Sequence, residues 1–264
     1  VESYYVDSGE AKNPGVGALA GLLYVDGASK TASSCSVENC AVSGYTVLYH
    51  ADISGRRDAA VGGMVGYSMG SVRNSSAMCK TIGAVMGSGT ESKIQKNIYI
   101  SGLVGGLARN GTIANSYAGA ELSGGNAGGY TAYYYSGLAG FDSVKNVWSD
   151  STGSSDSRTV TNSYAMSKLA AGAKSGTVYP VSPISGLTVS GCRYLKRILS
   201  GVALSDSSVS GRVTGLSERQ LGALTNLDGF GRASAEHTYP NSAVLKGQAY
   251  QYPAVVRAGG DFVH

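Results

Sequence analysis

Short apolar runs bounded by small residues recur along the first part of the chain, at Ala18-Leu-Ala-Gly21, Gly63-Met-Val-Gly66, Gly102-Leu-Val-Gly105 and Gly137-Leu-Ala-Gly140. Their closing glycines are separated by 45, 39 and 35 residues. A pair such as Leu-Val between glycines is too short for a helix and fits a buried strand. A phrase that returns at such intervals predicts a stack of similar units, each burying its apolar face on the next.

A second phrase follows each apolar run and is clearest in Ile113-Ala-Asn-Ser-Tyr-Ala118. Alternation predicts that Ile113, Asn115 and Tyr117 share one face of a strand and that Ala118 lies on the other. We expect the flanking glycines, Gly102 and Gly105 in this copy, to supply positive φ angles and to allow close approach between units.

Asparagine recurs at the same place in every copy of the second phrase. At a bend, an Asn side chain can satisfy backbone groups and can form a ladder with the Asn of the next unit. We therefore predict structural roles for the recurring residues, which are Asn39, Asn74, Asn115 and Asn162.

From about residue 180 the pattern changes, beginning with a turn at Tyr179-Pro-Val-Ser-Pro183. Ser217 at an N-cap position, with Gln220 three residues later and Leu221 after it, is the capping-box signature of a short helix. A terminal element of different character would cover the last unit of a stack. The sequence therefore predicts an all-β parallel β-helix (β-solenoid) over residues 1–179, and a solenoid extension with a short-helix-containing cap over 180–264.

The composition agrees with a turn-dense β protein. Charged residues make up 14% of the chain, against about 25% in an average domain, and there are 39 Gly and 18 Tyr.

The net charge is +4, and the basic residues are scattered along the chain except at Arg56-Arg57 and Arg193 to Arg197. No nucleic-acid-reading element is present, so nucleic acid is not an expected partner. No apolar run approaches the ~18 residues of a membrane span, so no membrane insertion is expected. The first residue is Val1 and no targeting segment follows it, which suggests a fragment of a larger multidomain protein.

The four cysteines show no Cys-x-x-Cys pair, and no histidine stands at metal-ligand spacing, so neither a metal site nor a cofactor is predicted. Cys35 and Cys40 are close enough in sequence to form a disulfide. The alternative is that both are small apolar fillers, a common use of free cysteine.

Catalytic motifs are also missing from the sequence: there is no Gly-x-Ser-x-Gly elbow and no phosphate-binding loop. Carboxylates on different units could still be brought together by stacking, as a polysaccharide-cleaving β-helix enzyme requires. The other interpretation is that they are solvated loop residues, and it leaves the chain without a catalytic site. The candidates are Asp52, Asp58, Asp142, Asp150 and Asp156.

Irregular segments between the copies are the expected place for partner contacts. Segment 119–136 combines glycines with Tyr130, Tyr133, Tyr134 and Tyr135. Tyrosine is favoured at binding surfaces because a rigid ring with a polar tip gives contact area at low entropic cost. Alternatively, alternate tyrosines of 133–135 pack inside a strand. Trp148, the only Trp in the chain, is either a partner contact or a plug at the edge of the core.

The two-part phrase, best preserved in residues 102–118, resembles the GLUG motif of repeat-containing bacterial surface proteins. The segment from Gly215-Leu-Ser-Glu-Arg-Gln-Leu221 onward is similar to the sequence that commonly follows those repeats. The first copy departs from the pattern because it carries an insertion and lacks the Tyr of the second phrase. The resemblance implies a secreted or cell-wall-anchored protein with a β-solenoid body, often an adhesin or a non-catalytic part of a longer chain. It also implies a partner, because some gut anaerobe surface proteins of similar make-up bind host immunoglobulins as B-cell superantigens.

Residues and resemblance together predict a non-enzymatic binding module of a bacterial cell-surface protein that contacts a host protein, most specifically immunoglobulin. The predicted contact residues are the four tyrosines above and Trp148. The alternatives are a structural spacer that lifts an adhesive domain from the cell wall, and the polysaccharide-cleaving enzyme already described.

Overall fold

The computed structural model describes residues 2–5, 15–23, 35–51, 58–86, 96–107, 110–125, 131–141, 158–183, 187–196, 202, 212–222, 230–232 and 253–255. In this part of the chain nearly every element is a strand, and the one helix is α1 (Glu218–Gly222). All strand pairs are parallel except one, between β24 (Phe230–Arg232) and β25 (Pro253–Val255). The predicted all-β architecture with parallel sheets is confirmed.

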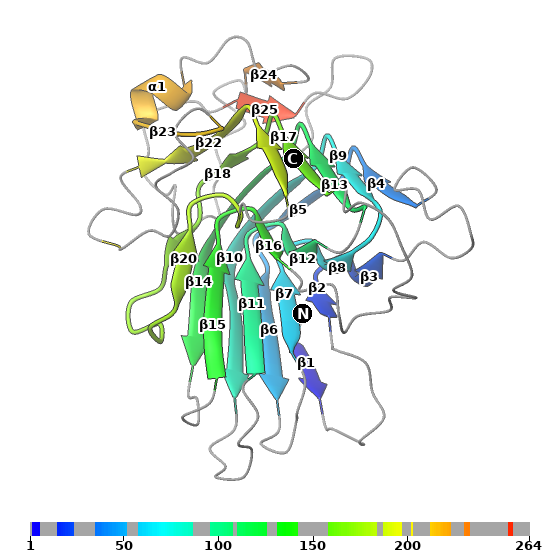
Figure 1. Cartoon of the computed structure of the whole chain (residues 1–264), viewed down its shortest axis with the longest axis vertical. Coiled ribbons are helices and arrows are strands. Elements are labelled where there is room, and N and C mark those ends of the chain that lie inside the picture. Colours follow the sequence, from blue (N-terminus) through cyan, green and yellow to red (C-terminus); the bar gives the residue numbers. More distant parts are fainter. Residues whose placement is uncertain are drawn as a thin grey trace.

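The chain passes through four parallel sheets in a fixed order and then repeats the passage (Figure 1). We call each passage a layer. The first layer holds β2 (Gly15–Gly17), β3 (Ala20–Leu23), β4 (Ser36–Glu38), β5 (Ala41–Ser43) and β6 (Thr46–Ala51), and β1 (Glu2–Tyr5) pairs with β6. The second holds β7 (Ala59–Gly62), β8 (Val65–Ser68), β9 (Ser71–Arg73) and β10 (Ser76–Met86). The third holds β11 (Lys96–Ser101), β12 (Val104–Leu107), β13 (Thr112–Ala114) and β14 (Tyr117–Gly125).

The last two layers are less regular. The fourth holds β15 (Thr131–Ser136), β16 (Ala139–Phe141), β17 (Thr159–Thr161), β18 (Tyr164–Ala165) and β19 (Lys168–Leu169). The fifth holds β20 (Thr177–Tyr179), β21 (Thr188–Ser190) and β22 (Cys192–Leu195), and β23 (Val213–Leu216) pairs with β22. Equivalent strands form sheet A (β1, β5, β6, β10, β14, β18, β19, β22, β23), sheet B (β2, β7, β11, β15, β20), sheet C (β3, β8, β12, β16) and sheet D (β4, β9, β13, β17, β21).

One apolar core runs through all the layers. In sheet D the middle residue of every strand points inward, and in the apolar phrase the residue after the first glycine does the same. Met64, Leu103 and Leu138 have no exposed surface. Each layer therefore buries its apolar residues on the next one, as the repeated phrase predicts.

The glycines of the apolar phrase are required by close packing between layers. A Cβ on Gly102 would overlap the carbonyl oxygen of Gly137, and one on Gly105 would lie 2.6 Å from the backbone nitrogen of Val61. Neither glycine has a positive φ; among the described glycines only Gly44, Gly172 and Gly191 do. The prediction that these phrase glycines supply positive φ is therefore wrong.

Asparagine supplies the left-handed backbone instead. The φ angles of Asn39, Asn74, Asn115 and Asn162 are 54°, 47°, 49° and 44°. Each of these residues stands where the chain bends from sheet D into sheet A, and Asn tolerates this conformation better than most residues do. The Asn162 Nδ2 donates a hydrogen bond to the Asn115 Oδ1 at 2.7 Å, which links two layers.

The bend also changes which residues share a face. Ile113 and Ala118, predicted on opposite faces of one strand, are both in the core. The left-handed residue between them ends β13 and starts β14 in a new direction, so the alternation does not continue across Asn115.

The serine after Asn74, Asn115 and Asn162 forms a second link between layers. The Ser75 backbone N–H donates to the Ser116 Oγ at 3.2 Å, and the Ser116 N–H donates to the Ser163 Oγ at 3.1 Å. The Ser116 Oγ in turn donates to the Ala114 carbonyl at 2.8 Å. These buried hydroxyls satisfy backbone groups that the bend leaves without strand partners.

The capping box of the predicted helix is present. The Gln220 N–H donates to the Ser217 Oγ at 3.2 Å, and the Ser217 N–H donates to the Gln220 Oε1 at 2.9 Å. The helix α1 begins just after β23, and its residue Leu221 is fully buried. The short helix predicted in the C-terminal part of the chain is confirmed.

We expect Asn115→Ala to lower the free energy of unfolding by about 2–3 kcal/mol, because Ala loses the Asn162 hydrogen bond and tolerates left-handed backbone poorly. Asn115→Gly should cost about 1 kcal/mol, since Gly keeps the backbone geometry and loses only the hydrogen bond. Urea denaturation of the two variants measures the difference. Equal losses would contradict the left-handed role of Asn115.

Gly102→Ala should destabilise the fold by about 3 kcal/mol or more, because the added methyl group overlaps backbone that cannot shift without separating two layers. Gly125→Ala is the matched control, since its Cβ would meet no atom closer than 3.5 Å. Thermal unfolding of both variants tests this expectation, which fails if the two melting temperatures fall equally.

Candidate interaction surface

The outer face of sheet D presents small polar side chains in two columns. In each strand the middle residue, Val37, Val72, Ile113, Val160 or Val189, is buried, and the first and third residues lie on the outer face, where all but Ser71 are at least partly exposed. The register aligns one column of Ser36, Ser71, Thr112, Thr159 and Thr188, and a second of Glu38, Arg73, Ala114, Thr161 and Ser190. We call these ten residues the sheet D face.

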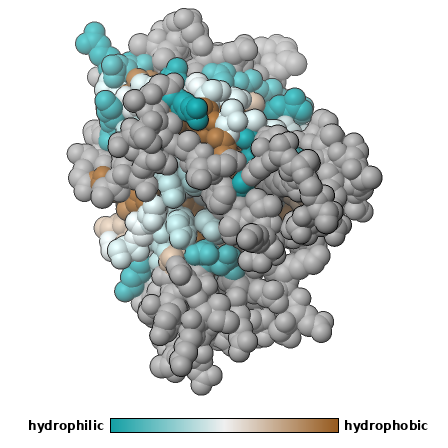
Figure 2. Space-filling model, in the orientation of Figure 1, coloured by the Kyte–Doolittle hydropathy of each residue, from teal (hydrophilic) through white to brown (hydrophobic). Residues whose placement is uncertain are grey.

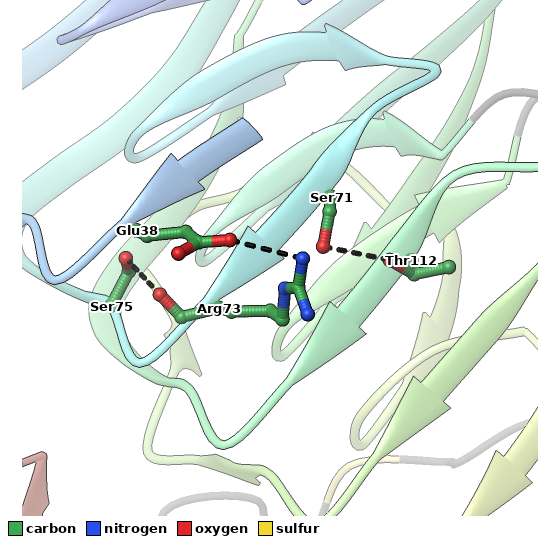
Figure 3. Close-up of polar contacts among 5 residues, drawn as sticks. All are labelled: Glu38, Ser71, Arg73, Ser75 and Thr112. Atoms are coloured by element: carbon green, nitrogen blue, oxygen red, sulfur yellow. Dashed lines mark hydrogen bonds and ion pairs between the residues drawn. The ribbon is translucent and has the colours of Figure 1, made fainter. Parts of the chain in front are cut away.

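Charge on this face is confined to its N-terminal end (Figure 3). The Arg73 Nη2 lies 3.0 Å from the Glu38 Oε1, and both side chains are more than 40% exposed. An exposed pair of this kind contributes about 0–1 kcal/mol to stability. Next to it, the Thr112 Oγ1 donates to the Ser71 Oγ at 3.0 Å, which ties the second layer to the third.

The opposite end of the sheet D face carries only uncharged hydroxyl side chains. Thr159 and Thr161 are partly exposed, and Thr188 and Ser190 are exposed. Strand hydroxyls in register offer donors and acceptors on a flat surface, without the entropic cost of ordering long side chains. This arrangement is suited to contact with another protein.

The predicted tyrosines are divided between core and surface. Tyr133 and Tyr135 are 2% and 0% exposed, and their hydroxyls donate to the carbonyls of Gly125 at 2.5 Å and Lys174 at 2.8 Å. Tyr133 and Tyr135 therefore follow the alternative prediction, in which alternate tyrosines pack on the buried face of the strand. Their buried rings offer no surface to a partner. Tyr130 and Trp148 lie outside the described residues.

Tyr134 points the other way and is partly exposed. Its ring stacks on Tyr99 with centroids 5.2 Å apart, because the two residues are paired in register between β11 and β15. Tyr67 and Ala60 pack in the same outer cluster. No local sequence pattern indicates Tyr99 or Tyr67 as neighbours of Tyr134, since only the register between layers brings them together.

Burial keeps Tyr133, Tyr135, Cys79 and Cys192 in their neutral forms. It raises the pKa of Tyr133 to about 12, and it raises the pKa of Tyr135 strongly, with a smaller effect from the adjacent Tyr133. Burial also raises the pKa of Cys79 to about 12 and that of Cys192 to about 11. Thiols with such pKa values are poor nucleophiles near neutral pH.

Cys35 and Cys40, the pair for which a disulfide was one alternative, are both free. The Cys40 Sγ donates a hydrogen bond to the Glu38 carbonyl at 3.2 Å. Cys40 also occupies the position that Ser75, Ser116 and Ser163 hold in later layers, and its backbone N–H donates to the Ser75 Oγ at 3.2 Å. In this structure it is the first member of that ladder.

Of the five candidate carboxylates, only Asp58 is among the described residues. The Asp58 Oδ1 accepts a hydrogen bond from the Asn97 backbone N–H at 2.7 Å, and its Oδ2 accepts one from the Asn97 Nδ2 at 3.2 Å, so Asp58 joins β11 to the layer before it.

Within the described ranges, no three His, Cys, Asp or Glu side chains are grouped to hold a metal ion. The helix there is also far too short to cross a bilayer.

Among the residues that Figure 2 colours by hydropathy, the apolar (brown) ones form only small separate areas, surrounded by pale and teal residues. Among the described residues, the large apolar side chains that are exposed are Leu19, Tyr45 and Val85. Single exposed apolar residues are ordinary in proteins. The polar sheet D face, rather than an apolar patch, is therefore the candidate surface.

No protein-family model matches the chain, and no curated protein matches it in sequence. A solved structure that is similar in fold is a "putative immunoglobulin A1 protease" from Bacteroides ovatus, with a TM-score of 0.50 and 18% identity. The match covers 80% of this chain and 57% of that one, so this chain spans little more than half of that chain's length. At this identity the likeness concerns the fold alone, and it agrees with the layered, parallel all-β architecture.

The buried tyrosines predict a loss of stability at alkaline pH. A pKa raised in the folded state means that folding favours the neutral phenol, so the stabilisation is full below pH ~10 and is lost as pH rises toward 12. The double variant Tyr133→Phe/Tyr135→Phe should flatten the fall in melting temperature between pH 10 and 12. At pH 7 it should cost about 1–3 kcal/mol from the two lost hydrogen bonds. An unchanged slope would show that other groups cause the alkaline loss.

Proposed function

We propose that the chain is a non-enzymatic β-solenoid binding module of a bacterial cell-surface protein of the GLUG-repeat type. It acts outside the cell, secreted or anchored to the wall, as part of a larger multidomain protein. Its partner is a host protein, most specifically immunoglobulin, and it requires no cofactor.

The observation that carries this proposal is the division of the repeated phrases between frame and surface. Gly102, Leu103, Asn115 and Ser116 are all used in contacts between layers. The outward side chains of sheet D point away from the core, and those that link layers lie at its N-terminal end, in the pairs Glu38–Arg73 and Ser71–Thr112. Repeat proteins commonly bind through such extended lateral surfaces.

The contact proposed is therefore the uncharged end of the sheet D face. Tyr134, on sheet B, is proposed as a separate contact. Strand hydroxyls and partly exposed aromatic rings are both common at wet protein interfaces. The name of the structural neighbour mentions immunoglobulin A1, and this supports the choice of immunoglobulin A as the first ligand to test.

Binding is tested by immobilising the chain and measuring retention of purified human immunoglobulin A. Retention should fall about tenfold in Thr161→Glu/Ser190→Glu, because two carboxylates would be desolvated in the contact, at a cost of about 1.4 kcal/mol for each tenfold loss. Ser43→Glu/Ser175→Glu is the matched control, since it adds the same charge at two exposed positions outside the sheet D face. This control should bind like the unmodified chain.

Three results would count against the proposal. If the unmodified chain retains no immunoglobulin or other serum glycoprotein, the binding function is lost. If both double variants bind equally well, the contact is not the sheet D face. If immunoglobulin incubated with the chain is cut into fragments, the module is not a passive binder.

The spacer alternative is favoured by one observation, the continuous hydrogen-bond links from layer to layer, which make the stack stiff. It predicts that the chain binds no host protein and that removing Tyr134 leaves bacterial adhesion unchanged. The polysaccharide-cleaving alternative predicts new reducing or unsaturated ends after incubation with acidic glycans.

A further inference from the structure

Positive charge is concentrated in the unit formed by β22, β23 and α1. Residues 193–222 contain five Arg or Lys and two acidic residues, a net charge of +3 in a chain whose total is +4. Figure 1 shows the three elements together at one end of the molecule. We call this unit the basic cap; its described cations are Arg193, Lys196, Arg212 and Arg219.

The strand pairing brings the first three cations together. β22 and β23 are parallel neighbours, with Arg193 opposite Thr214, and the Cys192 N–H donates to the Arg212 carbonyl at 3.2 Å. The aliphatic stem of Lys196 lies across Gly215, where a Cβ would be 2.7 Å from the Lys196 Cγ and Cε. Adjacent strands are about 4.8 Å apart, so Arg193, Lys196 and Arg212 start from neighbouring positions along these two strands.

The helix adds the fourth cation. Leu221 is fully buried, and Arg219, two positions earlier and thus about 200° around a helix, is exposed. Among the residues that the structure describes, ion pairs join Glu38 to Arg73 and Glu121 to Lys168, and the four cations belong to neither. Lys196, Arg212 and Arg219 are all exposed to solvent.

We propose that the basic cap binds an acidic polysaccharide through its sulfate or carboxylate groups. Exposed cations spaced over two strands and a helix fit a linear polyanion, which gains from several weak, salt-dependent contacts at once. Thr214, exposed between them, can hydrogen-bond sugar hydroxyls. The proposal does not rest on immunoglobulin binding, because the basic cap belongs to sheet A and the sheet D face does not.

Two other polyanions fit the described residues less well. A membrane surface favours an exposed apolar face beside the charges, whereas Leu195 and Leu221 are fully buried. Nucleic acid is read by long helices in a groove or by aromatic rings that stack on bases. α1 has five residues, and Tyr194 packs against the core.

The test measures affinity of the full chain for heparin and for alginate, a sulfated and a carboxylated polysaccharide, with neutral dextran as the blank. Arg212→Gln/Arg219→Gln should bind heparin about tenfold more weakly, because it loses two charge-assisted contacts of roughly 0.7 kcal/mol each. Lys80→Gln/Lys174→Gln removes the same charge at exposed positions outside the basic cap and should bind as the unmodified chain does. Arg212→Lys/Arg219→Lys should retain most of the affinity.

The proposal is overturned if dextran binds as well as heparin, or if the Lys80/Lys174 variant weakens as much as the Arg212/Arg219 variant. It is also overturned if single-stranded DNA or phosphatidylserine vesicles bind more tightly than both acidic polysaccharides. All variants are checked for an unchanged melting temperature, which exposed Arg-to-Gln changes should preserve. Loss of immunoglobulin binding alone would leave this result unaffected.

Discussion

The close approach of successive layers at the Gly-Leu turns is the constraint on which the structure depends. The Leu138 carbonyl accepts the N–H groups of Leu103 and Val104 at 2.9 and 3.1 Å, and the Val181 carbonyl does the same for Leu138 and Ala139. Such an arrangement holds only if no side chain separates the turns. The glycines follow from that requirement, and the continuous core follows from the glycines.

The bend from sheet D to sheet A meets a different requirement with a different residue. A left-handed backbone there could be supplied by Gly, as it is at Gly191 in the fifth layer with a φ of 62°. Asn115 and Asn162 add a side-chain hydrogen bond between the third and fourth layers, whereas the Oδ1 atoms of Asn39 and Asn74 are buried without a hydrogen-bond partner among the described residues. The serine that follows Asn74, Asn115 and Asn162 fills the bend with a hydroxyl. The two repeated phrases therefore solve two separate problems, turning tightly and bending with satisfied backbone groups.

Because the frame uses nearly all of the repeated residues, the surfaces are free to differ from layer to layer. The sheet D face changes from an ion pair at Glu38 and Arg73 to threonines and serines in the later layers. The basic cap differs again, because four described cations, Arg193, Lys196, Arg212 and Arg219, lie in or beside β22, β23 and α1. A stiff frame with distinct lateral and terminal surfaces is suited to presenting more than one contact at fixed spacing.

The sequence by itself determined the all-β class, the repeated strands and the capped helix at Ser217, because these depend on short-range patterns of apolar, turn and capping residues. It could not assign Tyr133 and Tyr135 to the core and Tyr134 to the outside, since alternation gives two equivalent choices until neighbouring layers decide which face is buried. Nor could it pair Tyr99 with Tyr134 or align the columns of sheet D. Those neighbours are set by register between layers, and register exists only in the tertiary structure.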